Sequence, residues 1–202
     1  MSSDARLYLL TPELSAADLV AFAPRLAAAL AAGDVASVLV RLAPGADAKR
    51  IVGPLIEIAA AHDAASLIEG DARLAARLGA DGVHVEIADV AAAVENFKSQ
   101  RIVGAGGLKL RDDAMAAAEA GADYVMFGEP GASPSLEATV ERVNWWAEIF
   151  QTPCVAYAAR LEDVAPLAAA GADFVALSGA VWDVGNSADA VRSAMSFLGR
   201  RA

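Results

Sequence analysis

The chain has 202 residues, a net charge of −10 and 56 % hydrophobic residues. This acidic balance argues against nucleic acid or an anionic membrane surface as a partner. The apolar stretches carry charges or break at glycine and proline, so no transmembrane span is expected. The single cysteine, Cys154, excludes an internal disulfide and is expected to be buried and inert. Because the first residues lack a signal-peptide pattern, we expect a cytoplasmic protein.

Short apolar runs alternate with helical patterns along the whole chain. The expected strands cover residues 7–10, 37–42, 65–68, 82–85, 101–104, 124–127, 154–156 and 174–177. The expected helices cover residues 16–32, 47–61, 72–78, 89–99, 111–120, 136–150, 161–170 and 189–198. Strict alternation predicts a parallel sheet. Eight such units in 202 residues predict an α/β fold, a (β/α)8 TIM barrel that forms one compact domain over residues 1–202. A doubly wound open sheet is the alternative, although the first strand lacks the glycine-rich turn that would favour it.

One phrase, Gly-Ala-Asp followed by an apolar run, recurs at residues 79–85, 121–127 and 171–177, with a looser copy at 33–40. The glycine suits the left-handed position that ends a helix. The apolar run suits a fully buried strand. The phrase therefore indicates a helix-to-strand joint that is used repeatedly. In a barrel of this kind the chemistry lies at the opposite end of each strand, where the strand leads into its helix.

The same phrases resemble the thiamine phosphate synthase/TenI family of small TIM barrels. The resemblance rests on residues 7–11, 78–84, 120–128 and 171–182, which match the family's opening strand, its Gly-Ala-Asp-Gly-Val-His signature, its sixth strand and its last strand. It implies a protein of thiamine biosynthesis. The implied reaction is the transfer that joins hydroxymethylpyrimidine diphosphate to thiazole phosphate, with Mg²⁺ as the cofactor.

The resemblance also implies roles for individual residues. Arg41 matches the diphosphate-binding arginine, although it can equally form a structural ion pair at the barrel mouth. Asp89 matches one of the two metal carboxylates. The other metal position falls on Gly70, so Asp71 or Glu69 would have to replace it, each from a shifted position. Asp71 and Asp89 equally suit helix N-caps. The substrate-binding candidates follow the fifth and last strands: Gly104, Gly106, Gly107, Lys109, Ser178 and Gly179. A glycine-rich turn can hold a phosphate on its N–H groups, but it can equally be a plain loop.

Other family positions differ in this chain. Leu39 stands where the family has glutamine, Ala158-Ala159 replaces a Gly-Gly phosphate turn, and the loop at 129–135 lacks the family's lysine. Acidic residues are added instead, because Glu69, Glu86 and Glu129 each follow a strand. Near 4 Å and at an effective dielectric of ~20, each like-charge pair costs on the order of 4 kcal/mol, which opposes a diphosphate. Grouped carboxylates can instead serve acid–base chemistry, or they can be solvated loop charges.

Three functions stay open at this point. The first is a thiamine phosphate synthase that is weak or inactive. The second is a drifted TenI-like enzyme that acts on a different small heterocycle. The third is a non-catalytic barrel that binds a ligand or a partner. The catalytic candidates are Arg41, Glu69 and Glu129, whereas His84 is expected to be a satisfied core histidine. The expected partner is a small molecule, and a homodimer stays open.

Overall fold

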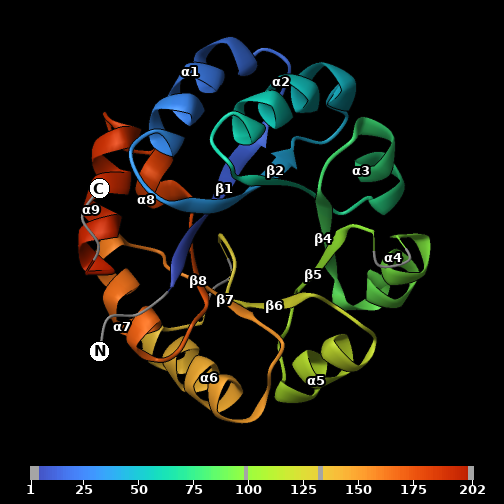
Figure 1. The fold of residues 1–202 in the computed structure, drawn as a ribbon, viewed down its shortest axis with the longest axis vertical. Coiled ribbons are helices and arrows are strands. Elements are labelled where there is room, and N and C mark those ends of the chain that lie inside the picture. Colours follow the sequence, from blue (N-terminus) through green and yellow to red (C-terminus); the bar gives the residue numbers. More distant parts are fainter. Residues whose placement is uncertain (1–4, 98–99, 132–133, 200–202) are drawn as a thin grey trace.

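The computed structural model of the chain describes residues 5–97, 100–131 and 134–199. Within these residues, eight strands pair in sequence order and close between β8 and β1. Every pairing is parallel. The strands form a central ring and the helices surround it (Figure 1). The (β/α)8 prediction is therefore confirmed, and the doubly wound alternative is wrong.

The strands are β1 (Arg6–Leu14), β2 (Val35–Leu42), β3 (Ala65–Glu69), β4 (Gly82–Glu86), β5 (Ile102–Gly106), β6 (Tyr124–Phe127), β7 (Cys154–Tyr157) and β8 (Phe174–Leu177). The helices are α1 (Leu19–Leu30), α2 (Ala48–Ala60), α3 (Ala72–Leu78), α4 (Val90–Phe97), α5 (Arg111–Glu119), α6 (Leu136–Ile149), α7 (Val164–Ala169), α8 (Gly179–Trp182) and α9 (Ser187–Phe197). Single 3₁₀ turns, Ile87–Asp89 and Leu161–Asp163, precede α4 and α7. The sequence did not predict α8, because one helical turn is too short to show a period. No helix in the described part of the chain is long and apolar enough to cross a membrane.

β1 runs beyond its predicted end at Leu10. Proline lacks the N–H that a sheet ladder needs, so Pro12 reads as a strand terminator. It is tolerated here because β8 pairs with β1 only as far as Leu9. The register with β2 also shifts between Leu10 and Glu13. This extension matters for function, since it places Glu13 beside Arg41 of β2.

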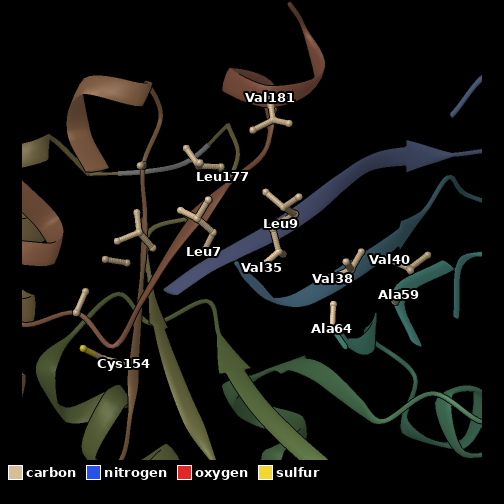
Figure 2. Packing of buried hydrophobic residues seen from close by; sticks show 14 of the residues in the cluster. Leu7, Leu9, Val35, Val38, Val40, Ala59, Ala64, Cys154, Leu177 and Val181 are labelled. Carbon is tan, nitrogen blue, oxygen red and sulfur yellow. The ribbon is translucent and has the colours of Figure 1, made fainter. Parts of the chain in front are cut away.

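Alternate strand residues face opposite sides of the barrel wall, as a period of two requires. The outward set packs under the helices, and Figure 2 shows Leu7 and Leu9 of β1, Val38 and Val40 of β2, and Ala59 of α2 in this layer. The inward set fills the barrel and consists of Tyr8, Leu10, Leu39, Leu67, Tyr124, Met126, Val155 and Ala176. The last inward position of each strand therefore places its side chain at the barrel mouth, the end formed by the C-terminal ends of the strands.

The repeated phrase forms the helix-to-strand joints at the end of the barrel opposite the mouth. Gly79, Gly121 and Gly171 have φ values of 80°, 96° and 102°, so all three adopt the predicted left-handed conformation. The glycine at each joint lets the chain reverse without a Cβ clash. The prediction is confirmed for these three copies, whereas Gly33 of the looser copy is not left-handed.

The aspartate of each phrase fastens the start of the neighbouring strand. The carboxylates of Asp123 and Asp173 accept hydrogen bonds of 2.8 Å from the N–H groups of Val103 and Cys154. Asp81 accepts in the same way from the N–H and the hydroxyl of Ser66. Charged acceptors make the stronger class of hydrogen bond. These aspartates are therefore structural, and they lie far from the mouth.

The cysteine behaves as predicted. Cys154 is fully buried in the outward-facing layer. Burial, together with the negative charge of Asp173, raises the pKa of the Cys154 thiol to about 12. A thiol of that pKa holds almost no thiolate at neutral pH and is unreactive.

Candidate functional site

A cavity of about 90 Å³ opens at the C-terminal ends of β2, β3 and β4. We call it the mouth cavity. Its lining residues are Leu10, Leu39, Arg41, Glu69, Gly70, His84, Val85, Glu86, Met126, Glu129 and Pro130. The three acidic residues predicted at strand ends therefore converge on one cavity with Arg41. Glu69 and Glu86 are the last residues of their strands, one position inside the loops where the sequence placed them.

Arg41 is held between two carboxylates. Its side chain points inward from β2, and its backbone N–H donates to the Thr11 hydroxyl at 2.9 Å. Its Nε lies 3.2 Å from both carboxylate oxygens of Glu69. A terminal guanidinium nitrogen lies 3.5 Å from Glu13 on the extended part of β1. The arginine side chain is only 17 % exposed. Its charge is therefore compensated before any ligand arrives.

The mouth cavity carries an excess of negative charge. Among the described residues that line it, one side chain is cationic and three are carboxylates, those of Glu69, Glu86 and Glu129, which leaves two negative charges in excess. The Glu86 carboxylate lies directly over Gly107, where φ is +67° and a Cβ would overlap it. The potential of such a cavity favours cations and opposes phosphates.

The glycine-rich segment is not the loop that the sequence indicated. β5 continues through Gly106, so Gly104 and Gly106 are strand residues whose backbone groups belong to the sheet. A Cβ at Gly104 would meet the Tyr124 ring, and one at Gly106 would meet Nε2 of His84. These two glycines make room for inward side chains. Gly104 was also expected as the last strand residue, which is confirmed. The prediction that the segment from Gly104 to Gly106 forms an exposed turn is wrong, because short Gly-rich runs occur in crowded strands as well as in loops.

Gly107 and Lys109 lie beside a second cavity of about 100 Å³. Met126 and Glu129 border both this cavity and the mouth cavity. The segment is fixed, since the Lys109 N–H donates to Asp113 at 2.9 Å and Arg142 of α6 donates to the Lys109 carbonyl at 2.7 Å. Lys109 is exposed and does not line the mouth cavity.

The two predicted metal ligands share a different depression. Asp71 and Asp89 line a groove of about 310 Å³ beside α3 and α4, which meets the mouth cavity only through Gly70 and Val85. The Asp71 carboxylate accepts the N–H of Leu74 at 2.9 Å and so caps α3, as the alternative interpretation expected. Asp89 ends the 3₁₀ turn before α4. Among residues 5–97, 100–131 and 134–199, no group of three or more His, Cys, Asp or Glu side chains is placed to hold a metal.

Ser178 and Gly179 form the turn into α8. The Ser178 carbonyl accepts the N–H groups of Val181 and Trp182, and the Gly179 carbonyl accepts the N–H of Asp183. Neither Ser178 nor Gly179 is among the residues that line the mouth cavity. The mouth cavity therefore does not bring these two predicted substrate-binding residues together with Arg41.

His84 lies inward on β4 and is buried, as predicted, but its ring also lines the mouth cavity. Its Nδ1 is 2.9 Å from the Tyr124 hydroxyl, which is 2.8 Å from the Tyr8 hydroxyl. Burial, with a smaller contribution from Arg41, lowers the pKa of His84 to about 4. The imidazole is therefore neutral at physiological pH. Sequence reasoning missed both tyrosines and Glu13, although the period of two places Tyr8 and Tyr124 on the inward face.

Known proteins resemble this chain over most of its length. A model of the family "Thiamine monophosphate synthase" matches residues 7–181. The thiamine-phosphate synthase of Rhodospirillum centenum is 44 % identical over 194 residues, which cover 90 % of this chain and 91 % of that protein. The thiamine-phosphate synthase of Erythrobacter litoralis is 39 % identical over 127 residues, which cover 58 % of this chain and 60 % of that protein.

Solved structures share the fold. The thiamine phosphate pyrophosphorylase from Pyrococcus furiosus superposes with a TM-score of 0.81 at 21 % identity, covering 98 % of this chain and 97 % of that one. The 3-hexulose-6-phosphate synthase from Salmonella typhimurium gives a TM-score of 0.69 at 14 % identity, covering 95 % and 98 % of the two chains. At such identities the likeness concerns the barrel itself. The match to the family model and the full-length relative decide the family, and the chain belongs to the thiamine monophosphate synthase family.

Proposed function

We propose that this family member binds a small cationic heterocycle in the mouth cavity and that the family's synthase reaction is very slow or absent. The observation that carries the proposal is the position of Arg41. Its guanidinium lies between Glu13 and Glu69 in a cavity that two further carboxylates line. A diphosphate would have to displace these partners and approach an excess of negative charge.

The carboxylates have a use that does not involve phosphate. A protonated ring nitrogen or amine offsets their repulsion, and charge-assisted hydrogen bonds to carboxylates belong to the strong class. We assign ligand contact to Glu69 and Glu129, and we assign to Arg41 the role of orienting Glu69. Gly107 and Lys109 remain a candidate subsite for a polar substituent beyond Glu129. Ser178 and Gly179 shape the neighbouring turn in this proposal.

We propose that Mg²⁺ is not a resident cofactor of this chain. It prefers one or two carboxylates, waters and substrate phosphates in an octahedral arrangement. Asp71 and Asp89 are the candidate ligands, but the Asp71 carboxylate already caps α3 and Gly70 offers no side-chain donor. We propose that Mg²⁺ binds weakly in their groove, and no step of the proposed function depends on it.

The proposal is tested by paired probes in calorimetric titration. The cationic probe is 4-aminopyridinium, and the neutral probe of nearly the same shape is aniline. We expect the cation to bind at least about ten-fold more tightly, a difference of roughly 1.4 kcal/mol. Glu129→Gln should weaken the binding of the cationic probe several-fold. Glu119→Gln, on the exposed face of α5, is the matched control and should leave binding unchanged.

A turnover assay with both phosphorylated substrates and Mg²⁺ completes the test. We expect product formation at or near the background rate. Robust synthase turnover, or equal affinity for the two probes, would contradict the proposal.

A further inference from the structure

A hydrogen-bonded chain of three buried side chains crosses the barrel interior. The Tyr8 and Tyr124 hydroxyl oxygens are 2.8 Å apart, and the Tyr124 hydroxyl is 2.9 Å from Nδ1 of His84. The three residues are 2 %, 6 % and 8 % exposed. The interior of such a barrel is normally filled by bulky apolar side chains. A polar chain at this depth is costly unless every member is satisfied, so its retention calls for an explanation.

These three hydrogen-bonded side chains connect two cavities. His84 lines the mouth cavity. Tyr8 and Tyr124 line a separate cavity of about 210 Å³ at the opposite end of the barrel, which also includes Asp123 and Phe174. We call it the N-terminal cavity. The lining there is largely apolar, whereas the mouth cavity is lined by Arg41 and carboxylates.

Two proton arrangements satisfy the chain. In the first, Tyr8 donates to Tyr124 and Tyr124 donates to Nδ1 of His84, which leaves the ring proton on Nε2. In the second, Nδ1–H donates to Tyr124 and Tyr124 donates to Tyr8. The Tyr8 hydroxyl must then find an acceptor in the N-terminal cavity, and Nε2 is a bare acceptor. The first arrangement needs no outside partner for either hydroxyl.

The charges that face His84 favour the first arrangement. Glu69 is its register partner on β3, Glu86 lies two residues further along β4, and both line the mouth cavity together with Glu129. Carboxylates only accept hydrogen bonds, so an N–H directed toward them is stabilised and a bare nitrogen is not. Among the described residues that line the mouth cavity, Arg41 on β2 is the cationic side chain, and it is already paired with Glu69.

We propose that Tyr8 and Tyr124 are positioning residues that hold neutral His84 as its Nε2–H tautomer, so that the ring donates a hydrogen bond to an acceptor atom of the ligand in the mouth cavity. Two glycines make this geometry possible. Gly104 leaves space for the Tyr124 ring, and Gly106 leaves space for Nε2. Any side chain at either position would displace the chain of hydroxyls or block the donor.

The low pKa of His84 supports this role. Because burial lowers the pKa to about 4, the ring keeps a single proton across the neutral range. The position of that proton is then decided by the partner at Nδ1. The inference concerns the same cavity as the proposed function, but the tautomer is independent of the charge of the ligand.

The tautomer is measured directly by ¹⁵N nuclear magnetic resonance of the full chain without ligand. The sequence has two histidines, so His62→Gln assigns the signals of His84. We expect Nε2 to give the shift of a protonated nitrogen and Nδ1 that of a hydrogen-bonded acceptor. Tyr124→Phe should shift both signals toward a tautomer mixture, and Tyr8→Phe should cause a smaller change. Tyr157→Phe, at an inward position of β7 and outside the chain of hydroxyls, is the matched control.

The ligand contact is tested with pyridine N-oxide, a neutral ring with one strong acceptor oxygen. Tyr124→Phe should weaken the binding of pyridine N-oxide several-fold. The affinity for 4-aminopyridinium, which has no acceptor atom, should change less. A proton on Nδ1 in the unmodified protein, or ¹⁵N shifts that ignore Tyr124→Phe, would overturn the inference. Failure of 4-aminopyridinium to bind at all would instead contradict the proposed function and leave the tautomer result standing.

Discussion

Glu69→Gln should raise the affinity of the mouth cavity for pyrophosphate. The substitution removes the carboxylate 3.2 Å from Nε of Arg41 and keeps the shape of the side chain. A phosphate dianion on the guanidinium would lie ~6 Å from that carboxylate. At an effective dielectric of ~80 the repulsion is about 1.4 kcal/mol, and at ~40 it is about 2.8 kcal/mol. Because the Glu69 side chain is 41 % exposed, solvent and salt screen the interaction, and we take the lower value.

The expected gain is therefore roughly ten-fold in affinity. It is measured by calorimetric titration with pyrophosphate at low ionic strength. The gain should shrink as salt is added, since the Debye length falls to about 8 Å at 0.15 M. Glu119→Gln changes the net charge equally but lies outside the cavity, so it should give no gain. An unchanged or lower affinity in Glu69→Gln would refute the argument that this carboxylate blocks Arg41.

Three further predictions concern the frame of the site. Asp173→Ala removes the acceptor for the Cys154 N–H and should lower the free energy of unfolding in urea by about 1–3 kcal/mol, whereas exposed Asp112→Ala should not. Gly106→Ala drives a Cβ into His84 and should cost about 1–3 kcal/mol in the same assay; an unchanged midpoint would contradict the assigned contact. Because the pKa of His84 falls from 6.5 to about 4 on folding, the unfolded state binds more protons between those values, and stability should decline as pH drops through that window, by up to about 3 kcal/mol. His84→Gln should flatten this decline, and parallel pH profiles of the two proteins would contradict it.

The sequence predicted the barrel because strand alternation and the recurring joint are local signals. Gly79 shows this well, since its left-handed conformation follows from its place at a helix end. The placement of Glu69, Glu86 and Glu129 at one end of the barrel was also predictable, because parallel strands bring their C-terminal ends to one face. Whether their side chains converge there or splay outward was not predictable, because it depends on the conformation of each loop and side chain. To predict which side chains lie at this end of the barrel, it is enough to know each strand boundary to within a residue or two.

The remaining features depend on contacts between distant segments. Glu13 was missed because Pro12 reads as a strand end, and only the absence of a β8 partner there lets β1 continue. The Tyr8–Tyr124 bond joins residues 116 positions apart, which no local pattern reveals. Gly104 was interpreted as part of a turn because the ring that fills its Cβ space comes from the next strand.

The central claim is that the mouth cavity of this family member no longer accepts a diphosphate. Calorimetric titration of the unmodified protein with pyrophosphate, with and without Mg²⁺, tests it most directly. The compensated charge of Arg41 and the excess of carboxylates predict no binding up to millimolar concentrations under either condition. Mg²⁺-dependent binding in the micromolar range would contradict the account, because it would mean that Arg41, Asp71 and Asp89 still assemble an anion site.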